Sequence, residues 1–477
     1  MTAFVAAIDQ GSTATKGALF APDGREVAAA AVEVVRRVEG VRVEHDPEAL
    51  LASVREVLGD LRRQGEPAAL GLACQRSTCL VWERASGRPL TRAVSWQDRR
   101  EAERVGGMAA HAEEIARRTG LRLSPHYAAP KLAGLLAALP DGLERARGGE
   151  LAAGTLDAWL VGRLTGTDAT EPGHAGRTLL YDLETDRWSP ELCELWGVPE
   201  AALPALRPSA GDWGEAEGVP LRAVLGDQQA ALLGHGGWAE GVAAAHFGTG
   251  AFVLASTGGA VRRHPALLAA VLASTPEGRR FQLEGTVNSA GSAVDWACRL
   301  AGVPLAVWAE RPLEPERLPW VLPALAGAGA PWWRAEASGV AAGLGLATTG
   351  EELVGGVLAG VAMRVLDCVE ALREAGLAPA VLRVSGKLAR LAGLVGLLAD
   401  AGQVAVEVAE QEETGLLGAA RLAAAASGLP VDLAAAPPAR LRRDPAWPAD
   451  RAAALRTRWR AFAAQALDLP GLAEMAE

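Results

Sequence analysis

The strongest signals in this chain are two short segments, Phe4-Val-Ala-Ala-Ile-Asp-Gln-Gly-Ser-Thr-Ala-Thr-Lys-Gly-Ala-Leu-Phe20 and Val242-Ala-Ala-Ala-His-Phe-Gly-Thr-Gly-Ala-Phe-Val-Leu254. Each is an apolar run, a turn rich in glycine and hydroxyl residues, and a second apolar run, which predicts strand, tight turn and strand. Glycine admits positive φ and lets a ligand approach bare N–H groups, and successive N–H groups in such a turn form an anion-binding hollow. Two such turns in opposite halves of one chain predict two related domains that grip one polyphosphate, as in a phosphotransferase or an ATPase.

Either turn alone is more often an ordinary hairpin turn, so the inference depends on the pair. Neither segment matches the P-loop pattern Gly-x4-Gly-Lys-Ser/Thr, because Ala14-Thr15 precede Lys16 and Gly17 follows it. A strand rather than a helix is expected after each turn, which argues against P-loop and dinucleotide-binding folds.

The length and composition fit a globular enzyme of two domains. A chain of 477 residues is too long for one core, and we expect domains at residues 1–236 and 237–477, divided after Gly234-His235-Gly236. Half of the residues are hydrophobic and 22% are charged, which is typical of a globular protein. The net charge of −10 disfavours a nucleic acid as partner, because binding to its phosphates needs a basic surface.

The chain carries no signal for export or membrane insertion. Its N-terminus lacks the basic and then apolar pattern of a signal peptide. The uncharged stretch Gly241–Val261 is interrupted by five glycines and a histidine, so we interpret it as buried sheet rather than a membrane span. The five cysteines are scattered and odd in number, which favours reduced thiols in a cytoplasmic protein and no cysteine metal site.

Several helices can be placed from local signals. Pro47–Leu61 is expected to be helical, with Asp46 as N-cap and Pro47 at the first helical position. A charged helix is expected over Asp98–Arg118, a long amphipathic one over Glu351–Ala375 and one of small residues over Glu412–Ala425.

Four polar or aromatic residues follow predicted strands and are candidates for chemistry. Asp227 follows the apolar Val224-Leu225-Gly226 and could accept a proton from a hydroxyl that attacks phosphorus. Asp9 ends the first strand and could hold Mg²⁺. Arg76 could bind a polyol hydroxyl with its guanidinium fork, and Trp96 could wall the pocket. Each has a structural alternative, namely a helix N-cap for Asp227, a turn that bonds its own backbone for Asp9, and packing for the others.

Taken together and in order, the motifs resemble the FGGY carbohydrate kinases, and within them the glycerol kinases. The resemblance spans residues 4–428 and is specific as a set. It rests on Asp9-Gln-Gly-Ser-Thr13, Gln75-Arg76, Val81-Trp82-Glu83, Trp96-Gln-Asp-Arg-Arg100, Gly226-Asp-Gln-Gln229, Phe247-Gly-Thr-Gly250, Leu283-Glu-Gly285, Gly329-Ala-Pro-Trp-Trp333, the Gly339–Asp367 block and Gly415-Leu-Leu-Gly-Ala-Ala420. It implies an α/β fold of two actin/hexokinase-like (ribonuclease H-like) domains, with ATP and the alcohol in the cleft between them.

The resemblance also implies roles for particular residues. Asp227 would be the catalytic base and Asp9 the carboxylate associated with Mg²⁺. The nucleotide would be bound by Ser12, Thr13, Lys16, Gly248, Thr249, Gly291 and Gly386, and the substrate pocket would contain Arg76, Ser77, Trp96, His126, Gln228 and Phe252. The reaction would be transfer of the γ-phosphoryl group of MgATP to a hydroxyl.

The chain departs from the glycerol-kinase pattern at three places. Ser77 stands where glycerol kinases carry a glutamate, His126 replaces a tyrosine, and Lys387 replaces the second glycine of a Gly-Gly pair near the adenine. A site that loses a hydrogen-bonding partner loses discrimination between substrates. These departures argue against glycerol itself as the substrate and favour a related polyol or a keto-sugar, although the Gln-Met-His-Gly pattern of xylulose kinases is absent.

These observations leave three functional hypotheses. The first is a cytoplasmic kinase of a small polyol or sugar, which could form a homodimer or a higher homo-oligomer. The second is a regulatory protein on the same fold that binds nucleotide or sugar with weak catalysis. The third is an actin-like assembly or chaperone ATPase, which Arg76 and Trp96 disfavour.

Overall fold

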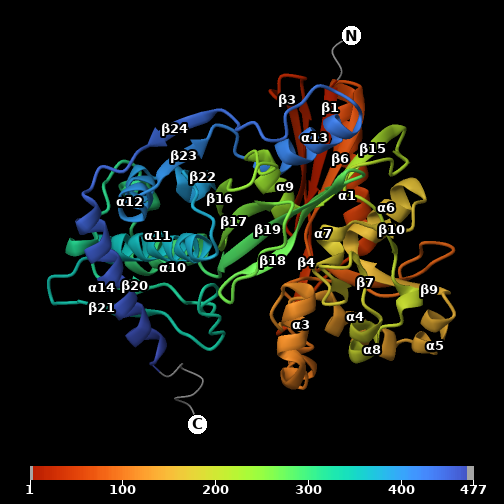
Figure 1. Ribbon diagram of the computed structural model, residues 1–477, viewed down its shortest axis with the longest axis horizontal. Coiled ribbons are helices and arrows are strands. Elements are labelled where there is room, and N and C mark those ends of the chain that lie inside the picture. Colours follow the sequence, from red (N-terminus) through yellow and green to blue (C-terminus); the bar gives the residue numbers. More distant parts are fainter. Residues whose placement is uncertain (1–3, 470–477) are drawn as a thin grey trace.

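Two α/β halves lie side by side in the computed structural model, which describes residues 4–469 (Figure 1). The first half is built on a six-stranded sheet in the order β14-β15-β6-β1-β2-β3. Its strands are β1 (Phe4–Gln10), β2 (Ala14–Phe20), β3 (Glu26–Glu33), β6 (Pro67–Cys74), β14 (Glu215–Ala216) and β15 (Val219–Gly226). The strands β1, β2 and β3 form an antiparallel meander, whereas β6 runs parallel to β1 and β15 parallel to β6.

The second half repeats this arrangement in a seven-stranded sheet with the order β18-β19-β17-β16-β22-β23-β24. Its strands are β16 (Ala243–Phe247), β17 (Ala251–Gly258), β18 (Leu268–Thr275), β19 (Gly278–Val287), β22 (Val381–Gly386), β23 (Ala405–Ala409) and β24 (Ala439–Arg443). Here β16, β17 and β19 form the meander, and β22 and β23 continue it in parallel. Both predicted hairpins, β1–β2 and β16–β17, are confirmed, as is the interpretation of Gly241–Val261 as sheet.

A third sheet, in the order β4-β5-β8-β7-β9, extends the first half away from its main sheet. Its strands are β4 (Arg36–Glu39), β5 (Arg42–His45), β7 (Cys79–Glu83), β8 (Ala93–Val94) and β9 (Leu151–Thr155). Short pairs and helices complete this region, namely α2 (Ala102–Gly106), α3 (Ala112–Thr119), α4 (Ala128–Ala138), α5 (Gly142–Arg147), α6 (Leu156–Thr165), α7 (Pro172–Ala175), α8 (Pro190–Trp196), β10 (Ala169–Thr170), β11 (Tyr181–Asp182), β12 (Arg187–Trp188) and β13 (Ala205–Leu206).

The helix predicted over Asp98–Arg118 is wrong as a single element. The Asp98 side chain is buried and accepts a hydrogen bond of 2.7 Å from the backbone N–H of Val43, which holds this segment against β5. The helix α2 begins only at Ala102 and ends at Gly106, with Gly107 as its C-cap, and α3 starts afresh at Ala112. A tertiary contact and a glycine pair thus interrupt the helical pattern.

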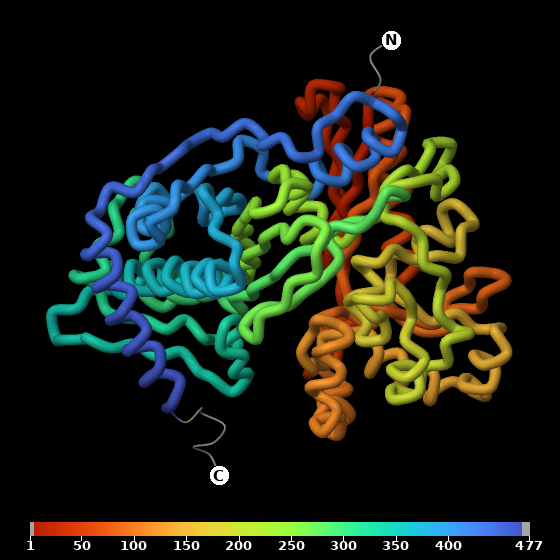
Figure 2. Tube along the Cα trace, in the orientation of Figure 1, coloured from red at the N-terminus to blue at the C-terminus, as the bar shows by residue number. Residues whose placement is uncertain are grey.

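Helices cover both faces of the first sheet. The helix α1 (Pro47–Gln64) packs on β1, β2 and β3, and the Asp46 carboxylate accepts from the N–H groups of Glu48 and Ala49, as predicted for its N-cap. The opposite face is covered by α9 (Asp227–Gly234) and α13 (Thr414–Ala426). Although α13 comes late in the sequence, the blue segment crosses over to the red N-terminal strands before the chain returns to the second half (Figure 2).

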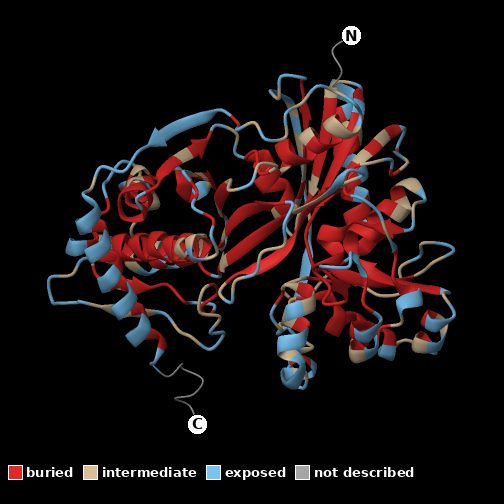
Figure 3. Cartoon of the chain, in the orientation of Figure 1, coloured by how far each residue is buried: buried red, intermediate tan, exposed pale blue. Residues whose placement is uncertain are grey.

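The second half has its own helical layer. The buried α11 (Gly350–Glu374) packs against β17 and β19 and is flanked by α10 (Gly291–Ala301) and α12 (Ala392–Gly402). The helix α14 (Ala449–Leu467) lies outside, with one exposed face, near the pair β20 (Trp320–Leu322) and β21 (Val340–Ala342) (Figure 3). Within residues 4–469, no helix is both long and apolar enough to cross a membrane.

Candidate active site

Two carboxylates lie at the same edge of the first sheet. Asp9 is near the end of β1, and Asp227 directly follows β15 as the first residue of α9. Because β1, β6 and β15 run in the same direction, their carboxyl ends share one edge. The two side chains are close enough for the charge of Asp227 to raise the pKa of Asp9.

The buried carboxylate of Asp9 has few interactions with the rest of the protein that would stabilise its negative charge. Its Oδ1 atom is buried and has no hydrogen-bond partner among the described residues, so the alternative of an aspartate that bonds its own turn is not observed. Burial, with Asp227 and then Glu413, raises the pKa of Asp9 to about 7, and Lys16 partly opposes this. A carboxylate with an unused buried oxygen fits a divalent cation that keeps several of its waters, as Mg²⁺ does.

Asp227 is held by an arginine and is not a helix cap. Its Oδ1 atom lies 3.2 Å from Nε of Arg76 and accepts a 2.8 Å hydrogen bond from the N–H of Gln228. The N-cap position of α9 is occupied by Gly226, which makes no side-chain cap. The Asp227 side chain is 30% exposed, so the carboxylate is accessible from outside the protein.

Arg76 also joins the two halves through a buried ion pair. Its Nη1 and Nη2 atoms donate to the two carboxylate oxygens of Glu284 on β19, at 2.7 and 3.1 Å, and Arg177 donates to the same carboxylate. Burial alone would raise the pKa of Glu284, but the Arg177 and Arg76 guanidiniums lower it to about 2. Glu284 therefore stays ionised and fixes the guanidinium of Arg76 next to Asp227.

An aromatic group borders this arginine. The guanidinium of Arg76 lies 6.0 Å from the ring centre of Phe252 on β17. The rings of Trp96 and His126 are 5.4 Å apart. Burial, together with the positive charges of Lys131, Arg177 and Arg76, holds the pKa of His126 well below its usual range. A neutral His126 offers one donor and one acceptor.

Gln228 and Ser77, two further residues predicted for the substrate pocket, differ in whether their polar side-chain atoms already have a hydrogen-bond partner. The Oε1 atom of Gln228 is buried and accepts no hydrogen bond from the described residues. Ser77 is fully buried with φ of 62°, and its hydroxyl donates to the carbonyl oxygen of Arg177 at 3.3 Å. Ser77 thus supports the Arg177 backbone in this structure.

The first glycine turn joins β1 to β2. It is closed by the N–H of Gly11, which donates to the carbonyl of Ala14 at 3.0 Å, and it presents Ser12 and Thr13 at its tip. Lys16 lies directly opposite Asp9 on β2, and its Nζ atom is 2.5 Å from Oε1 of Glu413, just before α13.

The second turn is packed against two other glycines. Gly248 and Thr249 follow β16, and a Cβ atom on Gly291, at the start of α10, would lie 2.5 Å from the carbonyl oxygen of Gly248. Gly386 ends β22 at φ of 92°, and a Cβ atom there would lie 2.3 Å from the carbonyl oxygen of Phe247. Bare backbone therefore surrounds this turn. Lys387 is exposed and faces Asp295 at 3.6 Å.

Both halves contribute to the space between these turns. The side chain of His246, two residues before Gly248, experiences the charges of Glu413, Asp227 and Lys16, the last two of which belong to the first half. Sequence reasoning assigned no role to Arg177, Glu284, Glu413 or His246. Two signals pointed to Glu284, namely its place in the motif Leu283-Glu-Gly285 and the presence of a carboxylate inside an otherwise apolar strand, but neither indicated its partner.

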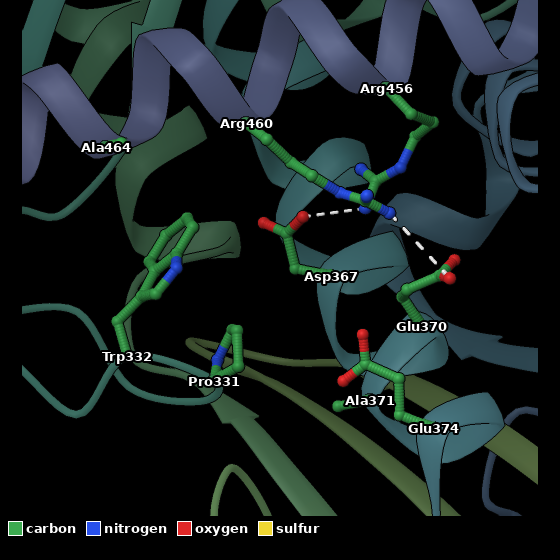
Figure 4. Close-up of a pocket in the computed structure, with 9 residues that line it drawn as sticks. All are labelled: Pro331, Trp332, Asp367, Glu370, Ala371, Glu374, Arg456, Arg460 and Ala464. Atoms are coloured by element: carbon green, nitrogen blue, oxygen red, sulfur yellow. Dashed lines mark hydrogen bonds and ion pairs between the residues drawn. The ribbon is translucent and has the colours of Figure 1, made fainter. Parts of the chain in front are cut away.

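A separate pocket of about 140 Å³ lies on the outer side of the second half, between α11, α14 and the loop of Pro331 and Trp332 (Figure 4). Four of its charged groups are paired with one another, as Arg456 binds Asp367 at 2.7 Å and Arg460 faces Glu370 at 3.8 Å. It contains none of the predicted site residues.

A repeated α/β fold with a glycine turn in each half, and with two carboxylates at the carboxyl edge of the first sheet, is the arrangement expected of a phosphotransferase. Residues 4–234 match the N-terminal domain and residues 243–427 the C-terminal domain of the FGGY family of carbohydrate kinases. The chain belongs to this family and is an ATP-dependent carbohydrate or polyol kinase similar to glycerol kinases.

Curated relatives and solved structures agree with this assignment. The chain is 36% identical to a glycerol kinase of Methylobacterium nodulans, over 90% of each chain. It is 40% identical to a glycerol kinase of Thermus brockianus, over 87% of this chain and 88% of the relative.

The glycerol kinase of Plasmodium falciparum, solved with ADP, superposes with a TM-score of 0.90 at 22% identity over 98% of this chain and 99% of its own. A xylulose kinase of Brucella ovis gives 0.88 at 24% identity, over 98% and 100%. The expected actin-like architecture is confirmed.

Proposed function

We propose that this kinase transfers the γ-phosphoryl group of ATP to a hydroxyl of a small polyol and that Asp227 is its general base. The observation that carries the proposal is the position of Asp227, at the carboxyl edge of the first sheet, fixed by Arg76 and partly exposed to the cleft. A hydroxyl placed at Oδ2 would lose its proton to this carboxylate as the oxygen attacks phosphorus.

The phosphates would be bound from both sides. Ser12, Thr13 and Lys16 would serve one side, and Gly248 and Thr249 the other, with Gly291 and Gly386 leaving room for the nucleotide. Asp9 would hold Mg²⁺ through its unused Oδ1 atom, and the ion would neutralise charge on the phosphates. On nucleotide binding, the ammonium group of Lys16 would have to leave Glu413 or to contact both Glu413 and a phosphate. In this proposal residues 1–236 supply most of the acceptor site and the first phosphate turn, and residues 237–477 supply the nucleotide side, with Phe252 reaching the acceptor from the second half.

The acceptor would lie against Trp96, His126 and Phe252, with its hydroxyls on Arg76 and on the free oxygen of Gln228. The buried Ser77 would shape this pocket from behind. A keto-sugar is the second candidate, because neutral His126 keeps an N–H that can donate to a carbonyl oxygen.

A panel of polyols and keto-sugars in an ADP-release assay tests the proposal, with Asp227→Asn as the inactive control. We expect turnover that depends on the acceptor and is highest with a small polyol. Highest turnover with a keto-sugar would favour the second candidate. Release of ADP at the same rate with and without every acceptor would contradict both.

A further inference from the structure

Three side chains lie in a row on one face of the second sheet. His246 on β16 is directly opposite Ser385 on β22 and directly opposite Phe252 on β17. Residues that pair directly across strands point to the same face. Phe252 is the end of the row near Arg76, and Ser385 is the other end, next to the bare backbone of Gly386. His246 therefore lies midway between the proposed acceptor and nucleotide residues, on the strand β16 that packs beside α9 (Figure 1).

A buried hydrogen-bond chain fixes the His246 ring. The Nδ1 atom is 3.1 Å from the hydroxyl of Ser385, and that hydroxyl is 3.3 Å from Nε2 of His235. The Nδ1 atom of His235 is buried and has no partner among residues 4–469. Buried N–H groups without a partner are rarer than buried acceptors without one. The chain is thus oriented with His235 donating to Ser385 and Ser385 donating to His246.

This orientation leaves a proton on Nε2 of His246. Within the described part of the chain that atom has no hydrogen-bond partner, and it is not among the fully buried polar atoms, since His246 as a residue is only partly buried. It lies 3.8 Å from the position that a Cβ atom would take on Gly248, so the N–H borders the space at the second turn that glycine keeps empty. The charges that reach it are those of Glu413, Asp227 and Lys16, the groups around the proposed transfer path.

We propose that Nε2–H of His246 donates a hydrogen bond to the terminal phosphoryl group of the nucleotide and orients it between Asp227 and the second turn. The inference rests on the proposed function and adds to it a positioning residue held by Ser385 and His235. An N–H fixed from behind by a hydrogen-bond chain is preorganised, so it can hold the phosphoryl oxygen without rearrangement during transfer.

Two substitutions separate this role from a packing role. His246→Asn keeps an oxygen near the position of Nδ1, which can still accept from Ser385, but it removes the donor at Nε2. His246→Gln places an amide N–H near the position of Nε2. Ser385→Ala keeps the ring and frees its rotation. His111→Asn, at an exposed histidine before α3, is the matched control. Thermal unfolding and the affinity for ADP verify that each variant is folded.

For His246→Asn we expect kcat to fall roughly 10- to 100-fold, the effect of one hydrogen bond to a charged group, with the acceptor KM little changed. His246→Gln should recover most of the loss, and Ser385→Ala should show a smaller loss in the same direction. Equal losses in the Asn and Gln variants would overturn the proposal, because they would indicate packing.

A binding experiment separates this inference from the proposed function. Calorimetry compares ADP with a non-hydrolysable ATP analogue, which alone carries the terminal phosphoryl group. We expect His246→Asn to weaken binding of the analogue roughly 10-fold or more and to leave ADP binding unchanged. Equal effects on both nucleotides would overturn the inference. If His246→Asn weakens binding of the analogue alone, but the wild-type enzyme phosphorylates no acceptor, the proposed function is contradicted and the inference about His246 stands.

Discussion

The Nε atom of Arg76 lies 3.2 Å from Oδ1 of Asp227, so the residue two positions after β6 holds the carboxylate that begins α9. The other end of the same guanidinium is bound by Glu284 on β19 in the second half. One side chain thus aligns the proposed base with a strand of the opposite sheet, and the position of the base depends on how the two halves pack.

Replacing Asp227 by asparagine removes the proton acceptor and keeps the shape of the side chain. We expect kcat to fall roughly 10²- to 10⁴-fold, the usual contribution of a general base, while ADP still binds. Steady-state kinetics and ADP calorimetry check this, with Asp23→Asn in an exposed turn as control. A variant that keeps near wild-type kcat would refute the assignment.

Replacing Glu284 by glutamine leaves two buried arginines without their shared anion. We expect a loss of roughly 3–5 kcal/mol in the free energy of unfolding at neutral pH. The folded pKa of about 2 lies below the ordinary 4.5, so the stabilisation is present above pH 4.5 and is lost as pH falls toward 2.

The difference between wild type and Glu284→Gln should therefore shrink in acid. Urea unfolding at about pH 7 and about pH 4 measures it, and Glu56→Gln on the exposed side of α1 is the control. A difference that stays constant or widens toward pH 4 would be inconsistent with an ionised Glu284 between the arginines.

Gly291→Ala should disturb the second turn without touching the carboxylates. The new Cβ atom would lie 2.5 Å from the carbonyl oxygen of Gly248, so the turn must shift. We expect ADP to bind roughly 10- to 100-fold more weakly, because a displacement of about 1 Å at a binding site can have that effect. Gly106→Ala in α2, where a Cβ meets nothing within 4 Å, should leave ADP binding unchanged. Unaltered binding in Gly291→Ala would remove this turn from the nucleotide site.

Gly418→Ala tests the contact between α13 and α9. A Cβ atom at this position would lie 1.9 Å from the carbonyl oxygen of Ala230, and we expect destabilisation by about 1–3 kcal/mol or more. Gly396→Ala in α12 meets nothing within 4 Å and should instead stabilise by about 0.4–1 kcal/mol. The unfolding midpoints of both variants test this prediction. Equal shifts would mean that Gly418 is not needed for the close packing of α13 against α9.

Sequence patterns correctly predicted the features that depend only on residues close together in the chain. The two hairpins, the N-cap at Asp46 and the buried sheet over Gly241–Val261 could all be predicted from short segments, because turn chemistry and apolar runs determine them. The repeat of the hairpins also predicted two related halves. The family motifs brought in most of the candidate site.

Long-range contacts could not be predicted in this way. The pairing of Arg76 with Glu284 joins residues 208 positions apart, and no local signal indicates which arginine a strand carboxylate will meet. The wrong helix over Asp98–Arg118 has the same cause, since the bond from Val43 to Asp98 lies outside any short window. The packing of α13 on the first half likewise depends on glycines that contact distant backbone only in the folded chain, since Gly71 and Gly234 lie against α13 and Gly418 lies against α9.

That packing has a consequence for dissection of the molecule. A fragment that ended near residue 236 would present Val5, Ala7 and Leu232 to water where Leu416 and Ala420 cover them in the whole chain. The complementary fragment would carry α13 without the strands of the first sheet against which this helix packs. We therefore expect neither half to fold well when expressed alone, and we expect co-expressed halves to associate through α13.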